Sequence, residues 1–268
     1  MSETVRILVC IKQVPDPEAP ASSFRIHSET KTITAEGVPP VINPYDESAL
    51  ELAVRLKEAN PDVRLSAVAF GAKLARAVLM KSLAVGADEL YLIEDPSVEA
   101  DGMITAHILA TAARKIGFDL ILAGRQAADT NAGGVGLALA GLLDIPAVSW
   151  ARKIELEEKL LRVERVVPEG CEILAGTLPA LVTVSHEAGA LRMPNIINVR
   201  KAKTKPTHSW TLADLEIGKL PGRSVELTRL EAPKRERHCQ VIEGESPAET
   251  GASLSRKLVQ DGVLNLRS

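Results

Sequence analysis

Short apolar runs separated by segments of helical periodicity dominate the pattern of this chain. Five of these runs are rich in β-branched and aliphatic residues, at positions 5–11, 63–70, 89–93, 119–123 and 180–184. Continuous apolar runs are typical of strands covered on both faces, and strands that alternate with helices indicate a parallel sheet with right-handed crossovers. The pattern therefore predicts an α/β fold.

Start and stop signals place helices between these strands. Asn43 stands where it can cap a helix whose first turn holds Pro44 and Asp46, a combination favoured at helix N-termini. Two further helices are expected at residues 73–85 and 98–116, because a glycine follows each of them. Alternating patterns at residues 24–35 and 153–167 predict two inserted β-hairpins.

The composition changes after residue 185. Residues 186–240 are rich in Pro, Gly, Lys and Arg and lack regular periodicity, so we expect an extended arm rather than a continuation of the sheet. Ser246 and Glu249 then have capping-box spacing and predict a terminal helix that ends near residue 260. We therefore expect a domain at residues 1–185, the arm at 186–240 and, at 241–268, a helix that packs on another subunit, because it can bury little apolar area alone.

Composition excludes several classes of partner. The 268 residues are 46% hydrophobic and carry a net charge of −3, which gives no reason to expect nucleic-acid or membrane-surface binding. No apolar run approaches the roughly 18 residues of a membrane-spanning helix, so we expect a soluble, cytoplasmic protein. The cysteines and histidines are scattered without metal-ligand spacing, and no metal site is expected: Cys10, Cys171, Cys239, His27, His107, His186, His208 and His238.

The strand at 119–123 is followed by a polar, glycine-rich turn, GRQAADTNAGGVG, and then by an apolar helical pattern. Glycines let a backbone approach a ligand closely, and the amides and dipole of a helix N-terminus favour an anion. The turn is a candidate phosphate-binding loop, although it matches neither the GxGxxG nor the GxxxxGK motif. The alternative is that its glycines only shape a tight turn.

Five segments together resemble the β subunit of electron transfer flavoprotein. They are ILVCIKQVPD (7–16), INPYDESALELAVRLKE (42–58), AVGAD (84–88), the glycine-rich turn at 124–136 and LPALVTVSHEAGALRMPNIINVRKAK (178–203). Their order and spacing make the resemblance specific, and it covers essentially the whole chain.

The resemblance implies an adenine-nucleotide α-hydrolase-like (Rossmann-like) domain and a heterodimer with an α subunit that holds the redox-active FAD. Electrons would pass from flavin dehydrogenases, such as the acyl-CoA dehydrogenases of fatty acid β-oxidation, to an acceptor such as a membrane quinone oxidoreductase. No catalytic residue is implied. The pocket of the β subunit would hold a structural AMP or, in bifurcating members, a second FAD that accepts hydride from NADH.

Positions of the family's nucleotide pocket carry over to segments at the carboxyl ends of the predicted strands. The implied binding residues are Cys10, Asn43, Pro44, Tyr45, Asp46, Phe70, Gly124, Arg125, Gln126, Ala127, Ala128, Asp129, Thr130, Asn131, Ala132, Gly133, Gly134 and Val135. For Cys10 and Phe70 the alternative is plain core packing.

The family's docking loop matches the segment around Met193. Leu191, Met193, Pro194 and Asn195 would form it, with the flexible Met in place of a protruding Leu. The basic residues that follow can steer an acidic partner: Arg200, Lys201, Lys203 and Lys205.

The subtype depends on the binding loop. Bifurcating members usually carry Thr and Gln at positions that correspond here to Ala132 and Gly134, and the loss of two polar side chains beside a flavin favours AMP. Features such as Lys12 and Arg125 resemble bifurcating members instead. Two other classes remain open, a stand-alone adenylate-binding regulator and an ATP-cleaving adenylating enzyme, although the arm argues against the first. The second class needs a Ser-Gly-Gly phosphate loop after the first strand, and this chain has none there.

Overall fold

The computed structural model describes residues 4–98, 100–223, 225–232 and 239–264. The chain divides into two compact units, Met1–Leu230 and Glu231–Ser268. The sheet and the candidate site belong to the first unit.

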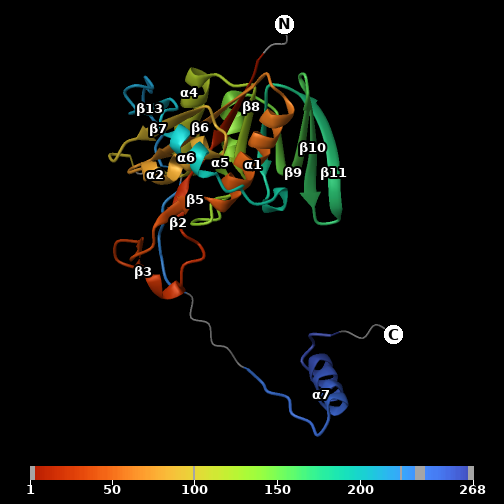
Figure 1. The fold of residues 1–268 in the computed structure, drawn as a ribbon. Helices are drawn as coiled ribbons and strands as arrows, with labels where there is room; N and C mark the ends of the chain where they lie inside the picture. Colours follow the sequence, from red (N-terminus) through yellow and green to blue (C-terminus); the bar gives the residue numbers. More distant parts are fainter. Residues whose placement is uncertain (1–3, 99, 224, 233–238, 265–268) are drawn as a thin grey trace. The chain divides into compact units, whose positions relative to one another are not determined.

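A nine-stranded sheet forms the centre of the first unit (Figure 1). Its parallel strands are β1 (Val5–Cys10), β6 (Val63–Gly71), β7 (Glu89–Glu94), β8 (Leu120–Gly124), β9 (Ala147–Glu157), β12 (Ala180–Val184) and β13 (Thr207–Trp210). Two antiparallel strands, β10 (Leu160–Val167) and β11 (Gly170–Thr177), extend one edge. The order is β11-β10-β9-β12-β8-β1-β6-β7-β13, so the loops after the neighbouring strands β1, β6 and β8 leave the same end of the sheet.

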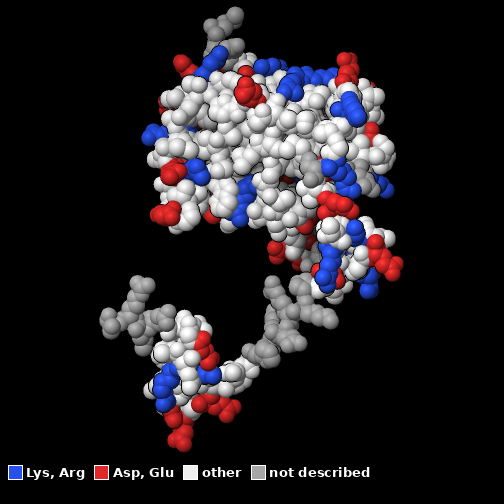
Figure 2. Space-filling view, turned by 180° about the vertical axis from the view of Figure 1, so that it is seen from behind, with Lys and Arg blue, Asp and Glu red and all other residues white. Residues whose placement is uncertain are grey.

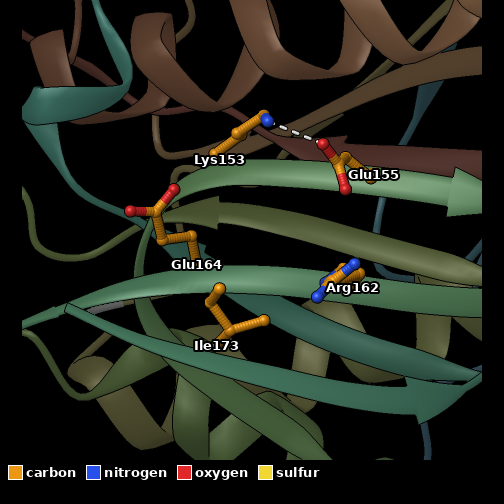
Figure 3. Close-up of a pocket in the computed structure, with 5 residues that line it drawn as sticks. All are labelled: Lys153, Glu155, Arg162, Glu164 and Ile173. Carbon is orange, nitrogen blue, oxygen red and sulfur yellow. Dashed lines mark ion pairs between the residues drawn. The ribbon is translucent and has the colours of Figure 1, made fainter.

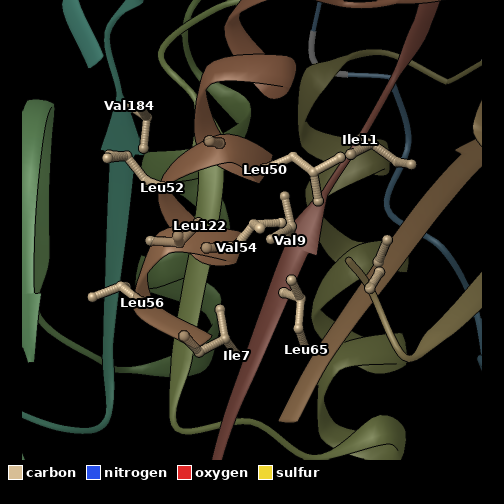
Figure 4. Packing of buried hydrophobic residues seen from close by; sticks show 14 of the residues in the cluster. Ile7, Val9, Ile11, Leu50, Leu52, Val54, Leu56, Leu65, Leu122 and Val184 are labelled. Carbon is tan, nitrogen blue, oxygen red and sulfur yellow. The ribbon is translucent and has the colours of Figure 1, made fainter. Parts of the chain in front are cut away.

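Helices cover both faces of this sheet. One buried cluster contains residues of α1 (Pro44–Ala59), α2 (Arg76–Leu79), α3 (Lys81–Val85) and α6 (Ile196–Ala202), and Figure 4 shows Leu50 and Val54 of α1 close to Val9 of β1 and Leu122 of β8. A second cluster contains residues of α4 (Gly102–Ile116) and α5 (Val135–Leu143). Burial of these aliphatic side chains on both faces is the main force that fixes the sheet.

The face opposite to that of Figure 1 carries few charges. In Figure 2 the Lys, Arg, Asp and Glu side chains of the first unit lie mostly near its margins. The sequence of α5, VGLALAGLL, contains no charged residue.

Two small antiparallel pairs lie outside the main sheet. β2 (Gln13–Pro15) pairs with β5 (Pro40–Ile42), and β3 (Phe24–His27) pairs with β4 (Thr32–Ala35) after a short 3-10 turn at Ala21–Ser23. The second pair confirms the hairpin predicted at residues 24–35. The hairpin predicted at 153–167 is confirmed by β9 and β10, and Glu158 at its turn has a positive φ of 54°.

The five predicted parallel strands are confirmed, but the helix predicted at residues 73–85 is correct only at its end, Val85 before Gly86. Two short helices, α2 and α3, stand there instead and meet at Met80. The backbone before α2 is held by a side chain, because Gln13 Oε1 accepts the N–H of Ala75 at 2.5 Å. A bond from a distant segment thus replaces the first helical turn.

The predicted helix at 98–116 starts later than expected. α4 begins at Gly102, because Asp101 caps it by accepting the N–H of Ile104 at Oδ1 (2.8 Å). Its end at Ile116, before a glycine, is as predicted.

The expectation that residues 186–240 do not continue the sheet is wrong for residues 207–210. This short segment, β13, pairs in parallel with β7 and forms an edge of the sheet. His208 stacks on Tyr91 of β7, with ring centroids 4.5 Å apart. The sequence analysis also missed β11, whose residues are nearly all exposed and therefore lack an apolar signal.

The second unit contains the predicted terminal helix, α7 (Pro247–Gln260). Ser246 Oγ accepts the N–H of Glu249 at 3.3 Å, which confirms the predicted cap. No residue of α7 is buried, and Leu254 and Val259 are exposed. The helix has no core of its own within the described residues.

Candidate functional site

The candidate site lies where the N-terminus of α1 meets the carboxyl ends of β1 and β8. The buried carboxylate of Asp46, in the first turn of α1, accepts the N–H of Lys12 at Oδ2 (2.7 Å) and the N–H of Gly124 at Oδ1 (2.9 Å). One side chain therefore joins the backbone that leaves β1 to the last residue of β8. This arrangement fixes the relative positions of the three segments that the resemblance assigns to the pocket.

Only glycine fits at position 124. A Cβ atom there would lie 2.7 Å from the Cβ of Tyr45 and would also collide with the Asp46 carboxylate. The close approach of α1 to β8 thus depends on the absence of a side chain. Gly134, in contrast, has open space around its Cα.

The buried position of Asp46 affects its ionisation. Burial raises the pKa of this carboxyl from 3.8 to about 7, although the N–H groups of Lys12 and Gly124 stabilise the charged form and oppose the shift. The carboxyl therefore titrates near neutral pH.

Asn43 stands at the N-cap position of α1, as predicted, but its side chain makes other contacts. Its side chain does not cap α1; its backbone carbonyl accepts the N–H groups of Asp46 and Glu47 (both 2.9 Å). The side-chain amide instead donates to the carbonyl of Gln126 (2.9 Å) and accepts the N–H of Ala128 (3.0 Å). Asn43 is thus a buried clamp on the glycine-rich turn, which we call the binding loop (residues 125–134).

Further side chains hold the shape of the binding loop. Gln126 Nε2 donates to Asn131 Oδ1 (2.9 Å), and Lys12 Nζ forms an ion pair with Asp129 (2.6 Å). Asn131 and Gly133 have positive φ angles of 52° and 65°, which Asn and Gly adopt most readily. The loop then enters α5 at its N-terminus.

Arg125, at the start of the binding loop, contacts two aromatic rings. Its guanidinium lies over the rings of Tyr45 (5.1 Å) and Trp150 (4.7 Å), an arrangement typical of cation–π contacts. Its Nε is buried and has no hydrogen-bond partner among the described residues. Trp150 and Lys12 are not among the predicted site residues, because neither residue type signals such a contact by its position alone.

The remaining predicted pocket residues are placed as follows. Cys10 ends β1 beside Ala123 of β8, and burial raises the pKa of its thiol to about 12, so it is not a nucleophile near neutral pH. Phe70, near the end of β6, packs against the second buried cluster. A contact of Cys10 or Phe70 with a nucleotide remains a prediction. The same holds for Pro44, Ala127, Thr130, Ala132 and Val135.

The residues of the predicted docking segment differ in their exposure to solvent. Leu191, which the resemblance assigns to the docking loop, is buried in the core and so offers little surface to a partner. Met193 is 85% exposed, and Asn195 caps α6 by accepting the N–H of Asn198 (2.7 Å). Pro194 is partly buried.

The helix that follows adds apolar surface that the sequence analysis missed. Ile196 and Ile197 are 74% and 63% exposed, and Val199 is also exposed. Together with Met193 they form the surface that we call the docking patch. Exposed aliphatic residues at the start of a helix have no distinct sequence signal, since the same residues are typical of a buried face.

Of the basic residues after the patch, Lys205 is not a free surface charge. Its ammonium donates to the carbonyls of Leu83 (2.9 Å) and Ala87 (2.5 Å), and burial lowers its pKa. The Lys205 ammonium is thus held in place by two neutral groups, and the steering role expected of this basic run remains a prediction. The other three basic residues are exposed: Arg200, Lys201 and Lys203.

A separate cavity of about 200 Å³ lies on the antiparallel strands β9, β10 and β11 (Figure 3). Its lining residues are Lys153, Glu155, Arg162, Glu164 and Ile173, and Lys153 and Glu155 form an ion pair at 2.6 Å. None of these residues belongs to the candidate site.

Over the described ranges the structure shows neither a metal-binding cluster nor a membrane-spanning helix. No group of three or more His, Cys, Asp or Glu residues there is arranged to hold a metal ion, and His238 lies outside these ranges. No helix of the part described is both long and apolar enough to cross a bilayer.

Comparison with known proteins identifies the family. The Electron transfer flavoprotein domain matches residues 30–215. The electron transfer flavoprotein subunit beta of Thermoanaerobacterium thermosaccharolyticum is 37% identical over 246 residues, which cover 90% of this chain and 93% of that protein. The chain belongs to the electron transfer flavoprotein β-subunit family.

Two other relatives illustrate the range of the family. The caffeyl-CoA reductase-Etf complex subunit CarD of Acetobacterium woodii is 33% identical over 97% of this chain and 100% of its own length. Protein FixA of Azotobacter vinelandii is 32% identical over 88% of this chain and 87% of its own length. The role of the family is electron transfer, and its β subunits are electron carriers rather than classical enzymes.

The titration of Asp46 predicts a specific pH dependence of stability. Between pH 4 and 7 the folded chain binds a proton that the unfolded chain has released, so the free energy of unfolding falls as the pH rises, with a slope of at most about 1.4 kcal/mol per pH unit. Asp46→Asn removes this titration. In urea unfolding at a series of pH values, the free energy of unfolding of the wild type minus that of the variant should fall between pH 4 and 7 and become constant above pH 8. A value of this quantity that rises with pH would contradict the assignment.

Proposed function

We propose that this chain is the β subunit of a heterodimeric electron transfer flavoprotein and that its candidate site holds a structural AMP. The partner α subunit would hold the redox-active FAD, which supplies the electron-transfer chemistry. The residues of this chain would bind the AMP, contact the α subunit and dock an electron donor. The proposed donors are flavin dehydrogenases such as acyl-CoA dehydrogenases in fatty acid β-oxidation, the acceptor is a quinone oxidoreductase, and the compartment is the cytoplasm.

The binding loop supports AMP as the ligand. Asn43 and the Asp46 bond network hold a loop that leads into the N-terminus of α5, and such a loop-to-helix transition favours a phosphate through its amides and dipole. The Lys12 ammonium is already neutralised by Asp129. Backbone groups rather than the Lys12 ammonium would therefore bind the phosphate.

The aromatic rings near the loop also support AMP over a second FAD. A flavin ring system offers a large flat surface that aromatic side chains bind well. Tyr45 and Trp150 each have one face covered by the Arg125 guanidinium, and Phe70 packs against the core. The adenylate part, which is common to AMP and FAD, needs less stacking surface.

One observation favours a second candidate function. The similarity to CarD, named as a subunit of a caffeyl-CoA reductase-Etf complex, extends over 97% of the chain. If this chain works in the bifurcating way, its pocket holds a second FAD that accepts hydride from NADH. Arg125, whose buried Nε lacks a partner, is then the residue with unused donor capacity near that flavin.

Asn43→Ala tests the proposed pocket. The substitution leaves the N–H of Ala128 and the carbonyl of Gln126 without their partner, so binding of AMP must order the loop that Asn43 otherwise holds. At about 1 kcal/mol for each lost hydrogen bond, this ordering lowers the affinity for AMP by up to roughly 30-fold. Calorimetric titration of AMP into the nucleotide-depleted heterodimer gives this affinity.

The matched control is Asn60→Ala at the other end of α1, where the Asn60 amide bonds only the carbonyl of Leu56 among the described contacts. Its affinity for AMP should equal that of the wild type. Equal losses in both variants would point to a general effect on α1, and an unchanged affinity in Asn43→Ala would count against the pocket.

Met193→Ala tests the docking patch. Removal of an 85% exposed apolar side chain should raise the apparent KM of an acyl-CoA dehydrogenase for the heterodimer about tenfold, as truncation of a central contact does in other interfaces. The FAD content should not change. Ile33→Ala, at an exposed apolar position on the β3–β4 hairpin, is the control and should keep the wild-type KM. Equal KM values for Met193→Ala and wild type would exclude the docking role.

Removal of residues 231–268 tests the proposed role of the second unit. Because α7 exposes Leu254 and Val259 and buries no residue, we propose that it packs on the α subunit. The truncated chain should copurify with a tagged α subunit in much lower yield, while the first unit, which has its own core, should keep its circular dichroism spectrum. Undiminished copurification would refute this role.

A further inference from the structure

One polar stripe of α1 holds the chain that leads to the docking patch. Ser48, Glu51 and Arg55 lie three and four residues apart and so share a face of the helix. Ser48 Oγ donates to the carbonyl of Gly189 (2.9 Å), and Arg55 Nη1 donates to the carbonyl of Ala188 (3.3 Å). The backbone before the patch is thus fixed along α1.

The strongest contact of this stripe joins Glu51 to Arg192. The carboxylate accepts the backbone N–H of Arg192 (3.1 Å), its Nε (3.0 Å) and its Nη2 (3.0 Å), and also accepts a bond from Arg55 Nε (2.9 Å). A two-pronged contact between an Arg and a carboxylate fixes both distance and orientation. Arg192 also reaches Glu58 at 2.5 Å.

Burial distinguishes the two carboxylates. The Glu51 side chain is 5% exposed, whereas that of Glu58 is 59% exposed. Burial by itself raises the pKa of Glu51, but the bonds from Arg192 and Arg55 outweigh it, and the net pKa is lowered. Glu51 is therefore a buried, charged partner, and the Glu58 pair is a surface contact of the kind that contributes little.

Arg192 immediately precedes the docking patch. Met193, the next residue, is 85% exposed. On the other side of the patch, α6 packs against α3 and Lys205 bonds the carbonyls of Leu83 and Ala87. The patch therefore lies between two fixed points of the backbone. Little conformational entropy is then lost when a partner binds to it.

We propose that Arg192, held by Glu51, is a positioning residue that fixes the docking patch before an electron donor binds. This inference rests on the proposed docking function. It adds that the affinity for the donor depends on a buried ion pair which does not itself touch the donor. Loss of the pair leaves the apolar contacts available but mobile, so each docking event must order them.

The test compares Arg192→Met, Glu51→Gln and Glu58→Gln in the full heterodimer. Electron transfer from an acyl-CoA dehydrogenase gives kcat and the apparent KM for the heterodimer, and hydrogen exchange reports the amides of residues 188–195. Arg192→Met and Glu51→Gln should raise KM five- to tenfold, change kcat less than twofold and speed exchange in this segment. Glu58→Gln, which makes the same chemical change at the exposed partner, should stay within twofold of wild type.

Arg192→Lys keeps the charge and loses the two-pronged geometry, so it should give an intermediate KM even if Arg192→Met does not fold. If Met193→Ala raises KM but Arg192→Lys, Arg192→Met and Glu51→Gln do not, the positioning role is overturned and the docking function stands. If Met193→Ala has no effect either, the docking function itself fails. A loss of kcat at unchanged KM would also overturn the inference.

Discussion

The arrangement of the candidate site depends on the carboxylate of Asp46. It is buried at the N-terminus of α1 and accepts N–H groups from the segment after β1 and from the last residue of β8. The contact is possible because Gly124 has no side chain. A buried carboxyl group is costly unless its hydrogen-bonding capacity is used, and here two strand ends and a helix are brought together to use it.

Helix α1 then links two parts of the molecule with different tasks. Its first turn, with Asn43 before it, holds the binding loop, and its middle holds the segment before the docking patch through Glu51. Its apolar face packs on the sheet between these polar contacts. The proposed nucleotide pocket and the proposed docking patch are therefore positioned by one helix.

The sequence was sufficient for the parts of the fold that local patterns determine. Continuous apolar runs such as residues 119–123 predicted the parallel strands, and Ser246 with Glu249 predicted the cap of α7. Where distant segments compete with local preference, prediction failed: Gln13 disrupts the start of the helix expected at residues 73–85. The edge strand β13 was missed because it is only four residues long and mostly polar.

The site was predictable to a similar extent. The resemblance located the binding loop and α1, but the bond between Asn43 and the loop joins residues 85 positions apart and has no local signature. The same holds for Glu51 and Arg192, which lie 141 positions apart. The burial of Leu191 beside the exposed Met193 depends on how the chain packs on α1, and hydrophobicity alone does not distinguish the two residues.

The central claim is that this chain contributes an adenine-nucleotide pocket to an electron-carrying heterodimer. Its most direct test is the nucleotide content of the complex, measured by acid release and chromatography after coexpression with its α subunit. The account predicts one FAD and one AMP per heterodimer. Two FAD and no AMP would contradict the assignment of AMP to this chain and would favour the bifurcating function, whereas one FAD with no second nucleotide would contradict the pocket itself.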